Sequence, residues 1–184
     1  KIPLISFQPL IADTARAFDG DDNADYYARN SLTVSEFTAV LEQLYAGGYV
    51  LVSMEDMAAP DNTGTYQPGQ ILLPEGKKPL ILSLVPAHYT TGLAGDGFAR
   101  RLVVASGGQI ACEYVDAEGK ATTGNYDLVS ILETFLTQHP DFSYRGARAI
   151  LGISGDPSPL GYDLTDETEQ ASARKVALCL LNTG

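Results

Sequence analysis

The stretch Pro79-Leu-Ile-Leu-Ser-Leu-Val85 decides the fold class of this chain. It is an almost uninterrupted apolar run, with one proline at its start and another, Pro86, directly after its end. A short apolar run bounded by turn residues is typical of a buried strand. Because the segments on either side alternate between strand and helix patterns, the sequence predicts a mixed α/β domain built on parallel strands.

One helix upstream of this strand is strongly marked. Thr33-Val-Ser-Glu36 has the residues of a capping box, in which Thr33 accepts from the Glu36 amide while the Glu36 side chain reaches back. Apolar residues follow at helical spacing on one face, and Gly47-Gly48 ends the helix. Strands are predicted over residues 1–7 and 49–53, a short helical turn over 54–57, and loops over 8–30 and 61–69.

Downstream, a small antiparallel insertion is predicted before the α/β pattern resumes. Gly107-Gly108 separates two strand patterns and is a strong hairpin signal. The predicted elements are strands over 102–106, 109–115, 120–123 and 149–154, and helices over 126–138 and from about 165 to 181. An α/β pattern would supply another strand after the last helix, so the sheet is expected to keep an exposed edge.

Length and charge limit the class of protein. The 184 residues fit one domain, 1–184, and the net charge of −11 with a pI of about 4.4 argues against a nucleic-acid partner. No apolar run approaches the roughly 18 residues of a transmembrane helix. Cys112 and Cys179 could pair or remain buried thiols, so they do not decide the compartment.

The residues alone do not supply a complete active site. The two histidines, His88 and His139, are too far apart in sequence for an H-x-x-x-H or H-E-x-x-H pair. His88 follows a buried strand, where α/β proteins place functional groups, whereas His139 lies at a helix end that explains it structurally. The acidic residues 19–22 lack regular calcium-loop spacing, and the spacing of Asp13 and Asp19 cannot establish a glycosidase pair.

Several segments, in this order and spacing, resemble polysaccharide deacetylases of the NodB-homology type, a carbohydrate esterase 4-like family. They include Ile5-Ser-Phe-Gln8, Gly47-Gly-Tyr-Val-Leu-Val-Ser53, Leu73-Pro-Glu-Gly-Lys-Lys-Pro-Leu80, Gly95-Asp-Gly-Phe-Ala99 and His139-Pro-Asp-Phe-Ser-Tyr144. The resemblance covers most of the chain. It implies a partial or distorted (β/α) barrel of the glycoside hydrolase/deacetylase type, with the antiparallel hairpin inserted, and with part of the domain expected beyond Gly184.

The resemblance also implies where catalytic groups should lie. In active members, the strand matching residues 79–84 runs into an Asp-Asp pair. The first Asp is the general base, and the second binds zinc or another divalent metal beside two histidines of an H-x-x-x-H motif. Here the matching positions are Val85 and Pro86, and Gln8 stands where relatives often carry a histidine. The histidine motif is expected after Gly184, so no catalytic, cofactor-binding or metal-ligating residue is assigned to this chain.

Three functional hypotheses follow. The first is a non-catalytic deacetylase-like protein that binds cell-wall polysaccharide, without a cofactor, outside a Gram-positive bacterial cell or on its surface. The second is a metal-dependent deacetylase whose ligands, such as Asp13, His88 or Asp96, are completed by residues outside this chain. The third is a structural domain that forms a homo-oligomer through its open sheet edge.

Overall fold

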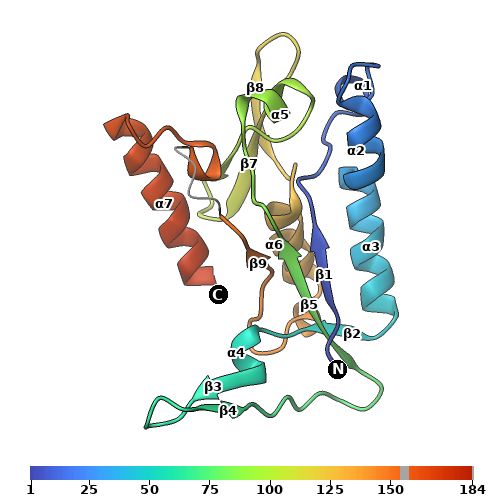
Figure 1. Ribbon diagram of the computed structural model, residues 1–184, viewed down its shortest axis with the longest axis vertical. Helices are drawn as coiled ribbons and strands as arrows, with labels where there is room; N and C mark the ends of the chain where they lie inside the picture. Colours follow the sequence, from blue (N-terminus) through green and yellow to red (C-terminus); the bar gives the residue numbers. More distant parts are fainter. Residues whose placement is uncertain (154–157, 184) are drawn as a thin grey trace.

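Strand β5 (Lys78–Leu84) is the central strand of the computed structural model, which describes residues 1–153 and 158–183 (Figure 1). The fold is mixed α/β, as the sequence predicts. The remaining strands are β1 (Leu4–Phe7), β2 (Tyr49–Leu51), β3 (Ala58–Pro60), β4 (Tyr66–Pro68), β6 (Arg101–Val104), β7 (Ile110–Val115), β8 (Ala121–Gly124) and β9 (Ile150–Leu151). The helices are α1 (Thr14–Ala17), α2 (Ala24–Asn30), α3 (Val34–Ala46), α4 (Met54–Met57), α5 (Thr91–Gly95), α6 (Leu128–Gln138) and α7 (Glu167–Thr183), with single 3-10 turns at Pro140–Phe142 and Pro159–Gly161.

The main sheet is parallel throughout. β1 pairs with β5 along one edge, with Leu4 opposite Ile81 and Phe7 opposite Leu84. β2 pairs with the start of β5, and β9 pairs with its end. The even-numbered residues of β5 form the backbone hydrogen bonds to the β2 and β9 segments. Lys78 N donates to the Gly48 carbonyl just before β2, and the Leu84 carbonyl accepts from Gly152 N just after β9. β2 and β9 therefore lie end to end along the same edge of β5.

The strands described do not close into a barrel. Within residues 1–153 and 158–183, β1 and β9 each have β5 as their sole strand neighbour, so the expected open edge is present on both sides of the sheet. The strand predicted over 149–154 is shorter than expected, and Ser154 lies outside the described residues. In the described part of the chain, no helix has the length and apolar character needed to cross a bilayer.

The predicted antiparallel insertion is confirmed. β6, β7 and β8 form a three-stranded meander in that order. The loop predicted over residues 61–69 is wrong in part, because β4 lies inside it and pairs with β3 as a second hairpin. Asp61 closes its turn, since Asp61 N donates to the Thr65 carbonyl and the Asp61 carboxylate accepts from Thr63 N. The sequence pattern alone did not reveal strands this short.

The loop predicted over residues 8–30 is also wrong, because α1 and α2 lie within it. Both helices are short, and aspartates satisfy the N–H groups at their starts. The Asp13 carboxylate accepts from Ala15 N and Arg16 N, and the Asp21 carboxylate accepts from Asn23 N and Ala24 N. The α3 capping box, in contrast, is present as predicted.

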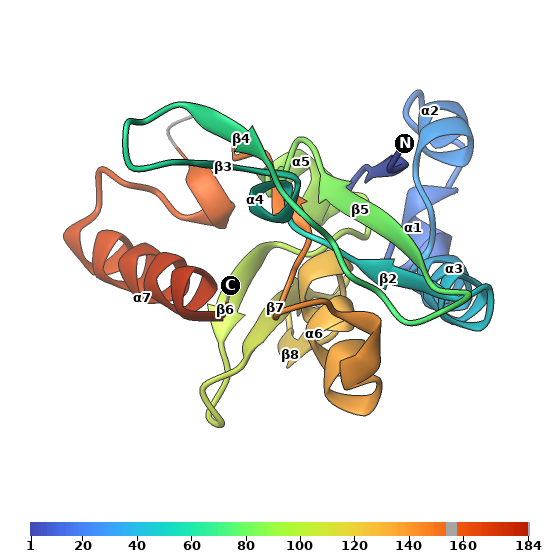
Figure 2. The same ribbon diagram turned by 90° about the horizontal axis from the view of Figure 1, so that it is seen from below.

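The main core lies on one face of the central strand. Leu80, Leu82 and Leu84 are completely buried and belong to the same apolar cluster as residues of α3 and α6. Figure 2 shows α6 and the antiparallel meander together on one side of β5. Burying each such leucine stabilises the fold by roughly 1.5–3 kcal/mol relative to exposing it. The core therefore fixes the carboxyl ends of β1 and β5, where loops converge.

Candidate functional site

The candidate site lies at the carboxyl ends of β1 and β5. In open α/β sheets this is the edge at which ligands bind. Gln8 directly follows β1, and Pro86 follows β5 after Val85, with a cis peptide bond between Val85 and Pro86. Gln8 Nε2 donates to the Val85 carbonyl at 3.4 Å, and both Gln8 and Pro86 line a hollow of about 260 Å³. Gln8 and the Val85–Pro86 bond are therefore neighbours in space.

The other wall of this smaller hollow comes from α2 and the residue before it. Tyr26, Tyr27 and Asn23 line it, and Tyr26 is 56% exposed. Tyr27 Oη donates to Asp96 Oδ2 at 2.6 Å, and Asn23 Nδ2 donates to the same oxygen at 3.2 Å. Burial, followed by this bond and the charge of Asp96, raises the pKa of Tyr27 far above its usual value, so it stays a neutral donor. The sequence did not point to these residues because their helix was predicted as loop.

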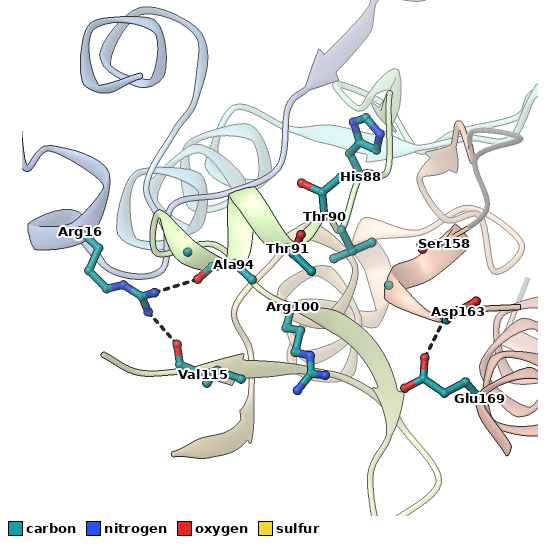
Figure 3. Close-up of a pocket in the computed structure, with 13 residues that line it drawn as sticks. Arg16, His88, Thr90, Thr91, Ala94, Arg100, Val115, Ser158, Asp163 and Glu169 are labelled. Carbon is teal, nitrogen blue, oxygen red and sulfur yellow. Dashed lines mark hydrogen bonds between the residues drawn. The ribbon is translucent and has the colours of Figure 1, made fainter. Parts of the chain in front are cut away.

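Figure 3 shows a larger hollow, which has a volume of about 630 Å³. It adjoins the smaller one, since His88 and Thr90 line both. Its further lining includes Arg16, Arg100 and, on the opposite side, Asp163 and Glu169. His88, which follows the buried strand β5, thus lines both hollows. The two hollows form one region at the end of the parallel sheet, with amide, hydroxyl, aromatic and guanidinium groups.

Arg16 fixes one wall of the larger hollow. Its guanidinium donates to the Val115 carbonyl at 2.7 Å and to the Ala94 carbonyl at 3.0 Å (Figure 3). Tyr114 Oη donates to Asp13 Oδ2 at 2.9 Å. Burial raises the pKa of Asp13, but the bond from Tyr114 and the cap bonds from backbone N–H groups outweigh burial and hold that pKa below its usual value. Asp13 is thus a charged structural acceptor that joins α1 to the meander.

One buried carboxyl group forms hydrogen bonds to the loops that follow β1 and β5. Asp127 is 1% exposed and begins α6, where its Oδ1 accepts from Leu128 N at 2.7 Å. The same oxygen accepts from Leu10 N at 3.2 Å, two residues after Gln8, and Oδ2 accepts from Tyr89 Oη at 2.7 Å. Burial raises the pKa of Asp127 despite these bonds. Asp127 therefore holds the loops after β1 and β5 in register.

The metal ligands considered from the sequence do not form a cluster. Across residues 1–153 and 158–183, no group of three His, Cys, Asp or Glu side chains is placed to hold a metal ion. Asp13 and Asp96 make the hydrogen bonds described above. Asp19 accepts from Asp21 N within the acidic loop. The His139 ring packs against Tyr45 at an interplanar angle of 45°, with ring centroids 4.4 Å apart.

The two cysteines and the neighbouring arginines are also placed. Cys112 and Cys179 are free thiols, the first buried and the second half-buried. Arg101 is partly buried and pairs with Glu113 and Glu169.

Compared with models of known protein families, with curated proteins and with solved structures, the chain matches none of them. The resemblance to polysaccharide deacetylases therefore rests on the sequence segments alone.

Proposed function

We propose that this protein is a non-catalytic, deacetylase-like domain that binds polysaccharide of the cell envelope. The observation that carries the proposal is the smaller hollow itself, in which Gln8 and Pro86 lie together. Proline offers no group that takes a proton or binds a metal ion, and neither does Val85. The metal chemistry of the family is then lost, while a hollow for a ligand remains at the same strand ends.

The lining of the smaller hollow supports a sugar as the ligand. Tyr26 offers an exposed aromatic ring, and a rigid ring provides a large apolar contact for the C–H face of a sugar. Asn23, Gln8 and Ser31 add amide and hydroxyl groups that can orient sugar hydroxyls. A few polar groups around an apolar contact are typical of small-molecule sites.

The proposal extends to the architecture and the setting. The four parallel strands are taken as one side of a distorted (β/α) barrel of the deacetylase type, and the open edges of β1 and β9 support this. The domain would act without a metal cofactor, outside a Gram-positive bacterial cell or on its surface. The acidic charge of −11 is compatible with that setting.

Isothermal titration calorimetry with the trisaccharide of N-acetylglucosamine tests the proposal. Tyr26→Ala should weaken binding about two- to twelvefold, because an aromatic contact contributes about 0.5–1.5 kcal/mol. Tyr66→Ala is the matched control, since Tyr66 is 70% exposed on β4 and does not line the hollow. Equal affinities of the two variants, or no heat of binding at millimolar sugar, would refute the proposal.

The alternative hydrolase is tested on the same material. Acetate release from the trisaccharide is measured after adding zinc, and we expect none above a no-protein control. Zinc-dependent release that is lost in His88→Ala would replace binding with catalysis. Light scattering tests pairing through a sheet edge, and a concentration-dependent dimer would favour the structural hypothesis.

A further inference from the structure

Arg100 is an exposed cation inside the larger hollow. Its side chain is 48% exposed, and it lies between the Arg16 wall and the Asp163–Glu169 wall (Figure 3). The nearest acidic group is Glu113, whose Oε1 is 3.5 Å from Arg100 Nη1. This contact is longer than the bond that a guanidinium normally makes to a carboxylate. Glu113 therefore neutralises Arg100 only in part.

Glu113 is already committed to another arginine. Arg101 Nε lies 2.9 Å from Glu113 Oε1, and Arg101 Nη2 donates to Oε2 at 3.4 Å. Arg101 also pairs with Glu169 Oε1 at 3.0 Å. The 2.9 Å contact is an ion pair in which neither Arg101 Nε nor Glu113 Oε1 completes a hydrogen bond. Arg100 is therefore the second cation on a carboxylate that already pairs with Arg101.

The other charged groups of the hollow are engaged within the protein. Glu169 Oε2 accepts from Asp163 N at 2.7 Å, and the Asp163 carboxylate accepts from Thr165 N at 2.8 Å. The Arg16 guanidinium donates to backbone carbonyls, as described above. Arg100 combines exposure with a weak internal partner, so its donors remain accessible to a ligand.

We propose that Arg100 forms a subsite for an acidic substituent of the bound glycan, with a sugar carboxylate as its ligand. The inference rests on the proposed function, because His88 and Thr90 connect this hollow to the one that holds the sugar. The guanidinium presents a planar fork of N–H donors that matches a carboxylate in two parallel bonds. A chain with a net charge of −11 repels an acidic sugar at long range, so a local cation is needed to hold one.

Calorimetry with two sugars tests the subsite. One is the neutral trisaccharide of N-acetylglucosamine, and the other is the disaccharide of N-acetylglucosamine and N-acetylmuramic acid, which carries a carboxylate. Arg100→Gln should weaken binding of the acidic sugar about fivefold and leave the neutral sugar unchanged. Arg174→Gln is the matched control, because Arg174 is exposed on α7 and lines neither hollow. Raising the salt concentration should reduce only the affinity that depends on Arg100.

The outcomes separate this inference from the proposed function. If both sugars bind and Arg100→Gln changes neither affinity, the subsite is refuted while glycan binding stands. If neither sugar binds, the proposed function fails and the subsite fails with it. N-acetylglucosamine 6-phosphate is a third probe, and a loss on Arg100→Gln confined to this sugar would assign the subsite to phosphate and overturn the carboxylate assignment.

Discussion

Replacing Asp127 with alanine should lower the free energy of unfolding by about 3 kcal/mol at pH 7. The substitution removes the acceptor of three buried donors, namely Leu10 N, Leu128 N and Tyr89 Oη. A buried donor without a partner costs about 1–3 kcal/mol, which gives roughly 3–9 kcal/mol for the three. Part of this loss is offset, because the variant no longer buries a carboxyl group whose charged form is poorly solvated.

Asp127→Asn is the informative comparison. Its amide oxygen can still accept from Leu10 N and Leu128 N, and its amide nitrogen can donate to Tyr89 Oη. The expected loss is therefore about 1 kcal/mol, from the one hydroxyl proton left without an acceptor. Asp22→Ala serves as the control, because Asp22 is exposed, and it should change the free energy of unfolding by less than about 0.5 kcal/mol.

The pH dependence gives a second test of the same group. Burial raises the pKa of Asp127 in the folded protein above the unfolded value of about 3.9. The stability contributed by its protonated form is therefore present below about pH 4 and lost as the pH rises through the folded pKa. Asn does not ionise, so the free energy of unfolding of Asp127→Asn does not fall in this way as the pH rises. The difference in unfolding free energy between the unsubstituted protein and this variant should therefore become smaller between pH 4 and pH 7. Urea unfolding followed by circular dichroism measures both effects. Equal losses for the alanine and asparagine variants at pH 7, or a deficit that widens with pH, would refute the reasoning.

Two further predictions concern the backbone and the thiols. Gly97→Ala should lower the free energy of unfolding, measured by urea titration, by more than about 2 kcal/mol, because the φ of Gly97 is +87° and a Cβ there would lie 2.5 Å from a backbone oxygen. Gly20→Ala is the control and should cost only about 1 kcal/mol, because Gly20 has a φ of +92° but open space around it. Equal losses for the two variants would show that the close contact has no effect. Burial raises the pKa of the Cys112 thiol to about 12. Ellman's reagent at pH 8 should therefore label Cys179 in the native protein and label Cys112 only after unfolding in urea. Labelling of both thiols at the same rate in native buffer would contradict this prediction.

Local patterns predicted the elements whose stabilising contacts lie close together in sequence. The α3 capping box joins residues three apart, and the turn at Gly107-Gly108 sits between the two strands it connects. The central strand is apolar from Pro79 to Leu84 apart from Ser83, so its hydrophobic run identifies it. Each of these depends on neighbours within a few positions, and each is confirmed.

The misses in the region of α1 and α2 depend on contacts between distant segments, whereas the missed β3–β4 hairpin is local and its strands are only three residues long. α1 is only one turn long, and Asp13 at its start is held by Tyr114, 101 positions away. Gln8 and Pro86 lie near each other because they follow β1 and β5, which are neighbouring parallel strands that end at the same edge of the sheet. Nothing in the sequence placed Tyr26 beside them, because α2 has no apolar period and its position depends on packing against the rest of the fold.

The pairing of β5 divides its amides between independent partners. Ile81 N and Val85 N donate to carbonyls before and within β1, whereas Lys78 N donates to the carbonyl before β2. At the far end of the same edge, Gly152 N donates to the Leu84 carbonyl. Local opening that releases β9 would therefore free the end of one edge of β5 while the bonds to β1 and β2 persist. The protection of β5 amides against hydrogen exchange should therefore alternate along the strand. Odd-numbered amides report on the pairing with β1, and even-numbered amides report on the pairing with β2 and β9.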